Sequence, residues 1–109
     1  MNKLCALFAY GTLKPGEEAQ HYLNQIAGIW HDAYVFGKYI TTLDIDYPII
    51  QLDLKGEKIV GKLFCSNQLS NIIEDIDEYE GDKYKRSISD VYLKNGSKIK
   101  AYIYTLNIK

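Results

Sequence analysis

The feature that most constrains the fold is an Asn-Gly pair, Asn95-Gly96, between two long runs rich in β-branched and aromatic residues. Asn-Gly favours the tight positive-φ turn that joins neighbouring antiparallel strands, so residues 84–93 and 98–106 are predicted to form a β-hairpin. The second run alternates, which predicts two faces: Ile99, Ala101 and Ile103 on one, and Lys100, Tyr102 and Tyr104 on the other.

The N-terminal residues predict a strand of another kind. Residues 4–10 are apolar on both faces, which is typical of a central strand that is covered on two sides. The strand stops at Gly11, and residues 11–16 have the Gly, Thr and Pro content of a loop. Residues 17–25 predict a helix, with Glu17 and Glu18 in its first turn, where negative charge is favoured.

The middle of the chain predicts more strands and a second helix. Residues 28–54, interrupted by Gly37 and by residues 44–48, predict two or three short strands. Residues 58–65 predict another, with Gly61 at a bulge or a close backbone approach. The spacing of Leu69, Ile72, Ile73 and Ile76 predicts a helix with one apolar stripe. Ser66 is its predicted N-cap, and Gly81 ends it.

This order of elements predicts an α+β fold. Strands outnumber helices and do not alternate with them, which favours a mainly antiparallel or mixed sheet curled toward a small barrel, with two helices. The length of 109 residues indicates a single domain over residues 1–109.

Charge and composition exclude some classes of function. Thirteen basic residues balance fourteen acidic ones, whereas a protein that coats duplex nucleic acid usually carries a basic stripe. We therefore expect no nucleic-acid partner, and no membrane partner, because no apolar run is long enough to span a bilayer. Residues 1–11 lack a secretion-signal pattern, so we expect a cytoplasmic protein in which Cys5 and Cys65 are reduced core thiols.

The first candidate site is the loop at residues 10–16. A Gly at the end of a buried strand, followed by a turn and a helix start, can present backbone N–H groups to an anion. Glu17 and Glu18 would repel a triphosphate, so a nucleotide site is disfavoured. A single carboxylate as ligand and an ordinary strand-to-helix turn both remain open.

The second candidate site is the acidic stretch at residues 74–82. It does not fit the calcium-binding EF-hand spacing, and most of its acids suit a solvated helix face. Glu80 differs, because it lies in phase with the apolar stripe. Burial of a carboxyl group raises its pKa, as a general acid-base requires. A partnered structural glutamate is the alternative.

Other chemistries find little support in the sequence. His21, His31, Cys5 and Cys65 are too scattered to suggest a zinc site, and both cysteines lie in strand-like segments that suit inert thiols. We therefore expect neither a metal nor a cofactor.

Several segments taken together resemble the gamma-glutamylcyclotransferase-like family, especially its small gamma-glutamylamine cyclotransferase branch. They are Phe8-Ala9-Tyr10-Gly11-Thr12-Leu13-Lys14-Pro15-Gly16, Tyr47-Pro48-Ile49, Val60-Gly61-Lys62-Leu63-Phe64, Ile76-Asp77-Glu78-Tyr79-Glu80-Gly81 and Tyr84-x-Arg86. They occur in the family's order across nearly the whole chain. Phe64 stands where the family usually has Tyr, and Ile76 where it has Leu.

The resemblance implies a small mixed barrel with two helices and a reaction that releases an amine or amino acid from a gamma-glutamyl amide, forming 5-oxoproline. It also implies that the backbone of Tyr10, Gly11, Thr12 and Leu13 binds the substrate and that Glu80 transfers protons. The short run before Tyr84 leaves the identity of the leaving amine open.

Further roles follow from the chemistry of that reaction. The substrate's own amine is the nucleophile, so the protein needs none. Tyr84 would line the site or pack, and Arg86 would bind the substrate carboxylate or form a structural ion pair with the acidic end of the helix. The alternatives to a cyclotransferase are a non-catalytic small-molecule-binding module on the same fold and a hydrolase of a related compound. We expect a monomer or a homodimer.

Overall fold

The computed structural model describes residues 4–10, 20–40, 49–81 and 84–106. Within these ranges the chain forms six strands and two α-helices, with one turn of 3-10 helix before the second. The strands are β1 (Ala6–Ala9), β2 (Ile29–Tyr39), β3 (Ile50–Leu52), β4 (Glu57–Cys65), β5 (Tyr84–Leu93) and β6 (Lys98–Leu106). The helices are α1 (Gln20–Leu23), η1 (Leu69–Asn71) and α2 (Ile73–Glu80).

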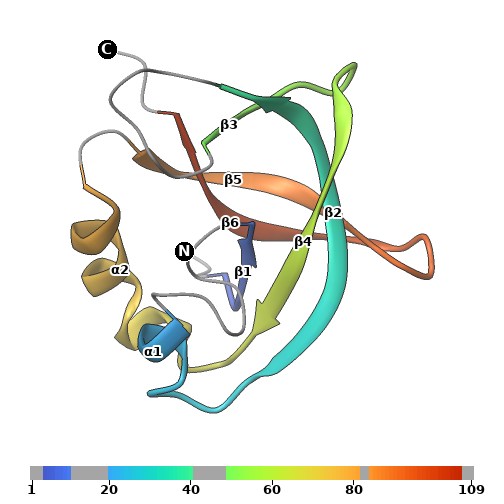
Figure 1. The fold of residues 1–109 in the computed structure, drawn as a ribbon. Coiled ribbons are helices and arrows are strands. Elements are labelled where there is room, and N and C mark those ends of the chain that lie inside the picture. Colours follow the sequence, from blue (N-terminus) through green and yellow to red (C-terminus); the bar gives the residue numbers. More distant parts are fainter. Residues whose placement is uncertain (1–3, 11–19, 41–48, 82–83, 107–109) are drawn as a thin grey trace.

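Five of the six strands close into a small barrel (Figure 1). The strands are hydrogen-bonded in the order β3-β2-β4-β1-β6-β5, and an additional pairing of β2 with β5 completes the ring. β1 and β6 run parallel, while the other pairs are antiparallel, so the sheet is mixed. The predicted α+β fold with a curled, mixed sheet is therefore confirmed.

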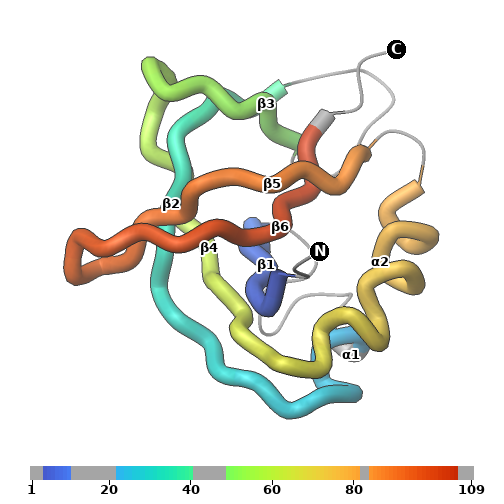
Figure 2. The backbone as a smooth tube through the Cα atoms, turned by 180° about the vertical axis from the view of Figure 1, so that it is seen from behind, coloured from blue at the N-terminus to red at the C-terminus, as the bar shows by residue number. Residues whose placement is uncertain are grey.

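β1 separates two apolar clusters. Ala6 and Phe8 point into the barrel interior, whereas Leu7 and Ala9 face the cluster that the helices cover. Burial of all four residues confirms the doubly covered central strand that the sequence predicts. α1 and α2 lie together on one side of the barrel, as the opposite views in Figures 1 and 2 both show. The predicted stripe anchors the second helical segment here, with Leu69, Ile72, Ile73 and Ile76 all buried.

The C-terminal hairpin forms with the predicted bounds. β5 and β6 pair from Tyr84↔Leu106 to Tyr92↔Lys98, and Gly96 takes the positive φ of 91° that the turn requires. Ala101 and Ile103 are fully buried in the barrel, as the alternation of the second strand predicts.

Other local predictions need correction. Gly37 does not interrupt the sheet but lies within one 11-residue strand, β2. Glycine is needed there because β3 passes so close that a Cβ would meet the Gln51 carbonyl oxygen at 2.5 Å. The Ser66 hydroxyl accepts from the Gln68 N–H at 3.1 Å, so it holds a turn that precedes the helix rather than acting as the helix N-cap. Cys5, which lies just before β1 begins at Ala6, has an exposed side chain and is therefore not a core thiol.

Gly61 marks a close approach between strands, which gives a first testable prediction. A Cβ at this position would lie 2.5 Å from the Ala9 carbonyl oxygen and 2.6 Å from Phe8 Cζ. We expect Gly61→Ala to lower the free energy of unfolding by about 1 to 3 kcal/mol, as overpacking usually does. Urea unfolding measures the change, with Val60→Ala on the exposed face of the same strand as control. Equal stability of Gly61→Ala and wild type would contradict the close approach.

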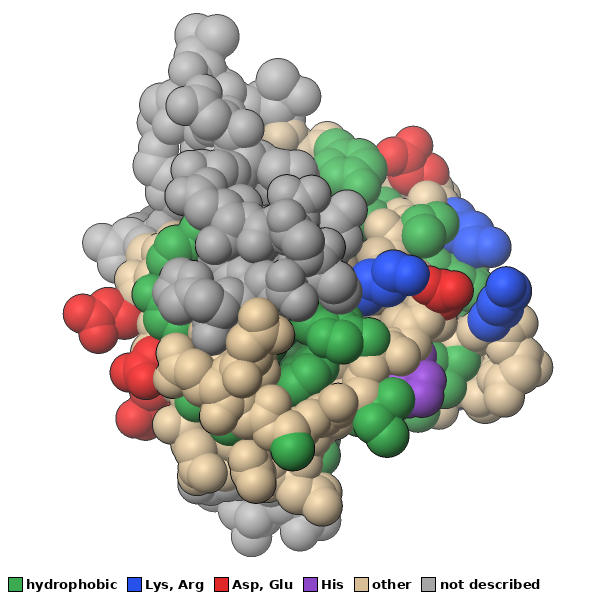
Figure 3. Space-filling model, turned by 60° about the horizontal axis from the view of Figure 1, so that its bottom comes forward, with side chains coloured by type: hydrophobic (Ala, Val, Ile, Leu, Met, Phe, Trp, Pro, Cys, Tyr) green, Lys and Arg blue, Asp and Glu red, His purple; other side chains and the backbone are tan. Residues whose placement is uncertain are grey.

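The surface carries both signs of charge. In Figure 3, basic side chains lie beside acidic ones on one side of the face shown, while acidic side chains alone gather on the other. Ion pairs join Lys62 to Asp32 and both Lys98 and Lys100 to Asp90. Within the described ranges, no helix has the length and apolar character needed to cross a bilayer.

Candidate functional site

Glu80 lies at the C-terminal end of α2, where the helix meets the start of β5. The buried stripe residues Ile73 and Ile76 press the helix against the barrel, and Glu80 follows in phase with them. Gly81 ends the helix with a φ of 79°, and its N–H donates to the Asp77 carbonyl oxygen at 3.2 Å. Burial raises the pKa of Glu80 from its usual 4.5 to about 7. Such a carboxyl group can both accept and return a proton near neutral pH.

Two tyrosine side chains share this end of the barrel with Glu80. The hydroxyl of Tyr10, directly after β1, is buried and donates to the backbone carbonyl oxygen of Tyr104 in β6. Burial, followed by the charge interaction with Tyr84, holds the pKa of Tyr10 above its usual range, and Glu80 acts in the same direction. Glu80 also contributes to the raised pKa of Tyr104, whose main cause is burial. These interactions bring the ends of α2 and β1 together with the start of β5.

The carboxylate of Glu80 is not engaged by the described part of the chain. No hydrogen bond or ion pair reaches it from residues 4–10, 20–40, 49–81 or 84–106. The partner that a structural glutamate would need is therefore not found in these ranges.

Arg86 forms the structural ion pair that was one of its two predicted roles. Its Nη1 lies 3.3 Å from Oδ2 of Asp77, and its guanidinium group stacks over the Tyr102 ring at 4.9 Å. Asp77 also accepts a hydrogen bond of 2.6 Å from the Tyr104 hydroxyl. Sequence reasoning did not single out Asp77 or Tyr104. The available signals were the predicted alternative of an ion pair between Arg86 and the acidic helix end, and the place of Asp77 three residues before Glu80 on the same side of the helix.

Some predicted site residues lie outside the described residues. They are Gly11, Thr12 and Leu13, and the same holds for Tyr47 and Pro48 of the family-like segments. The meeting of this loop with Glu80 therefore stays a prediction. Of the loop, the structure describes Tyr10, whose hydrogen bond to Tyr104 and charge interaction with Glu80 put the start of the loop at this end of the barrel. Tyr84 is half-buried there, and its N–H donates to the Gly81 carbonyl oxygen at 3.3 Å.

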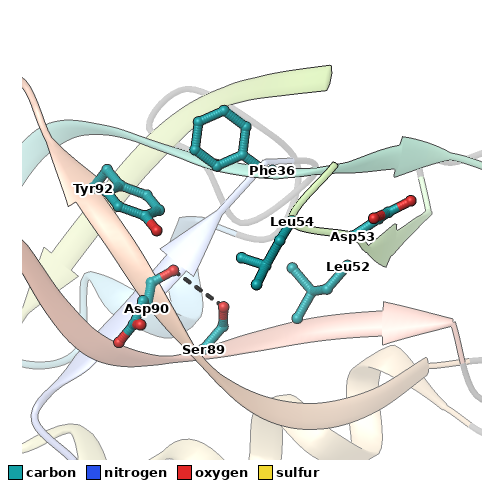
Figure 4. Close-up of a pocket in the computed structure, with 7 residues that line it drawn as sticks. All are labelled: Phe36, Leu52, Asp53, Leu54, Ser89, Asp90 and Tyr92. Carbon is teal, nitrogen blue, oxygen red and sulfur yellow. Dashed lines mark hydrogen bonds between the residues drawn. The ribbon is translucent and has the colours of Figure 1, made fainter. Parts of the chain in front are cut away.

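Surface hollows elsewhere are less suited to proton transfer. One, of about 190 Å³, lies between β3 and β5 (Figure 4), and another, of about 410 Å³, lies over β2 and β4. Asp90 in the first and Asp32 in the second are bonded to lysines, which hold the pKa of each carboxyl group below its usual range. These carboxylates stay ionised at neutral pH and are poor general acids. The lining residues are Phe36, Leu52, Asp53, Leu54, Ser89, Asp90 and Tyr92 in the first, and Asp32, Ala33, Tyr34, Lys58, Val60 and Lys94 in the second.

The acidic residues next to Glu80 form a solvated helix face. Glu74, Asp75 and Glu78 are exposed, as their phase relative to the apolar stripe predicts. Within the described ranges, no group of three or more His, Cys, Asp or Glu side chains is arranged to hold a metal ion.

Comparison with known proteins connects this geometry to a family. Residues 7–109 match the family described as gamma-glutamyl cyclotransferase, AIG2-like. YkqA from Bacillus subtilis shares the fold with a TM-score of 0.74 and 26% sequence identity; the match covers 98% of this chain but 37% of YkqA, so this chain spans less than half of that protein. No curated protein sequence matches the chain.

Two further solved structures have the same fold at lower identity. An AIG2-like protein from Mus musculus has a TM-score of 0.65 and 20% identity, with 95% of this chain and 78% of that one covered. A protein named gamma-glutamyl cyclotransferase has a TM-score of 0.63 and 17% identity, with 94% of this chain and 66% of that one covered. At these identities the likeness is one of fold.

Proposed function

Because the chain belongs to the gamma-glutamyl cyclotransferase, AIG2-like family, we propose that it is a cyclotransferase that releases an amine or amino acid from a gamma-glutamyl amide and forms 5-oxoproline. The observation that carries the proposal is the half-buried carboxyl group of Glu80, whose pKa is raised to about 7. The reaction needs one group that takes up a proton and then gives it back, and Glu80 has the properties of such a group.

The reaction is an intramolecular acyl transfer. The substrate's α-amine attacks its own γ-carbonyl carbon, a new C–N bond closes the five-membered ring, and the C–N bond to the leaving amine breaks. On closing the ring the α-ammonium nitrogen loses two protons, and the departing nitrogen gains two when it leaves as an ammonium group. In the proposed mechanism, the Glu80 carboxylate carries these protons one after the other, taking each from the attacking nitrogen and passing it to the departing nitrogen. The protons balance without water or a protein nucleophile, and the enzyme's other task is to hold the two reacting atoms close together.

Other residues have supporting roles in this proposal. Backbone N–H groups of Tyr10, Gly11, Thr12 and Leu13 would bind the α-carboxylate or the oxyanion of the tetrahedral intermediate. Tyr84, which is half-buried next to Tyr10, would line the site. Contact of the substrate carboxylate with Arg86 would have to compete with the ion pair that this residue forms with Asp77. The cytoplasmic location and the monomeric or homodimeric state remain predictions.

The product distinguishes this function from the alternatives. The protein is incubated with a panel of gamma-glutamyl amines and dipeptides, and the products are identified by mass spectrometry. We expect 5-oxoproline and the free amine. Free glutamate in its place would identify a hydrolase, and binding without any product would identify a binding module; either result would reject the cyclotransferase.

The pH dependence of activity tests the role of Glu80 in the free enzyme. A general base must be ionised, so kcat/KM should rise with pH through about 7, the raised pKa of Glu80. The profile is measured between about pH 5 and pH 9, with the ionisation of the substrate amine determined separately. A profile that is already flat above about pH 5 would mean that a carboxyl group of ordinary pKa, or none, acts as the base.

A further inference from the structure

Asp77 joins three elements, α2, β5 and β6, at the end of the barrel where Glu80 lies. Its Oδ1 accepts a 2.6 Å hydrogen bond from the Tyr104 hydroxyl in β6, and its Oδ2 lies 3.3 Å from Arg86 Nη1 in β5. The backbone carbonyl of the same residue accepts from the Gly81 N–H, which closes the last turn of α2. One residue therefore fastens the end of the helix through both its side chain and its backbone.

We propose that Asp77 is a positioning residue that clamps the last turn of α2 onto β5 and β6 and thereby fixes the place of Glu80 over the end of the barrel. This inference deepens the proposed function, on which its consequence for turnover rests. Asp77 itself need not touch the substrate, because both of its carboxylate oxygens have protein partners.

Tyr104 gives the clamp its rigidity. Its side chain is buried, its hydroxyl also lies 3.5 Å from the carbonyl oxygen of Ile73, and its backbone carbonyl accepts from the Tyr10 hydroxyl. Tyr104 therefore connects both turns of α2 to the strand that leads into the predicted substrate loop. Loss of its hydroxyl would leave the Asp77 carboxylate with the partly exposed Arg86 as its partner among the described residues.

The pKa of Glu80 is a measure of whether the clamp holds the helix end in place. Among the described residues, the charged and titratable groups at this end of the barrel are Tyr10 directly after β1, Tyr84 and Arg86 on β5, Tyr104 on β6 and Asp77 on the same helix as Glu80. Burial is the cause of the raised Glu80 pKa. A looser helix end would admit water to the carboxyl group and return its pKa toward 4.5.

The test compares two clamp variants with two matched controls. Tyr104→Phe and Asp77→Asn weaken the clamp. Tyr102→Phe makes the same change two residues earlier on the same strand face and keeps the ring under Arg86, while Glu78→Gln removes an exposed charge from the same helix. The titration of the Glu80 carboxyl carbon is followed by carbon-13 NMR, kcat and KM are measured with the substrate that the product assay identifies, and thermal unfolding establishes the folded fraction.

We expect both clamp variants to lower the Glu80 pKa and to reduce kcat by roughly tenfold, with little change in KM, because a displaced catalytic group impairs the chemical step. Both controls should leave the Glu80 pKa and kcat close to the wild-type values. Asp77→Asn breaks the ion pair with Arg86 but also removes a negative charge near Glu80, which lowers the Glu80 pKa by itself. Tyr104→Phe changes no charge and is therefore the decisive variant for the titration, while kcat is the measurement for Asp77→Asn if Tyr104→Phe does not fold.

The outcomes separate this inference from the proposed function. An unchanged Glu80 titration in both folded clamp variants would overturn the clamp, and so would equal losses in clamp and control variants. A wild-type protein that forms no 5-oxoproline would reject the proposed function. The titration would still test the clamp in that case, because it needs no substrate.

Discussion

Glu80→Gln is expected to lower turnover by about two to four orders of magnitude while the fold is kept, which is the usual effect of losing a general acid-base. The amide has nearly the shape of the carboxyl group but cannot accept the proton from the α-ammonium group or return it to the leaving amine. Substrate affinity should change little, since the proposed binding groups are backbone amides and other side chains. Steady-state kinetics with 5-oxoproline detection, together with direct binding measurements, would show the loss in kcat.

The control for this experiment is Glu78→Gln, two residues earlier on the exposed side of α2. It removes the same charge from the same helix and should retain wild-type turnover. Near-wild-type activity of Glu80→Gln would overturn the proposed mechanism. A loss of affinity with unchanged kcat would make Glu80 a binding residue instead of a proton carrier.

The elements that sequence alone could predict are those whose signals are local. Asn95-Gly96 predicts the hairpin correctly because a tight turn, with Gly96 at positive φ, imposes the pairing of its flanking strands. The apolar stripe of the second helix predicts its buried face, and from that face the burial of Glu80 follows. The identity of the site residues in the loop depends on the family resemblance, since a Gly-rich turn alone does not distinguish an anion site from an ordinary turn.

Interactions between distant segments were predicted only in part. An ion pair of Arg86 with the acidic helix end was one of the predicted alternatives, but its partner Asp77 and the hydrogen bond from Tyr104 were not identified, because barrel closure brings β5 and β6 next to α2 and no local pattern reports on that closure. Gly37 looks like a strand breaker in the sequence, yet it is needed where β3 passes close to β2. Cys5 looks like a core residue because its neighbours are apolar, but a strand end at the rim of the barrel leaves it exposed.

The burial of Glu80 should also make protein stability depend on pH in a way that Glu80→Gln removes. The folded-state pKa of about 7 lies above the usual 4.5 that applies to the unfolded chain. The folded protein therefore holds the proton more tightly, and this contribution to stability is fully present below about pH 4.5 and is lost as the pH rises through about 7. The loss amounts to roughly 3 kcal/mol in the free energy of unfolding.

The measurement is the difference in unfolding free energy between Glu80→Gln and wild type, from urea unfolding across this pH range. Other titrating groups contribute equally to both proteins, so the difference isolates Glu80. It should grow in favour of Glu80→Gln as the pH rises from 4.5 to about 7 and then level off, so that the variant gains stability under the conditions in which it loses activity. Glu78→Gln, an exposed control, should give a nearly constant difference. A constant difference for Glu80→Gln as well would show that its carboxyl group is hydrated in solution, and Glu80 would then lack the raised pKa on which the proposed proton transfers depend.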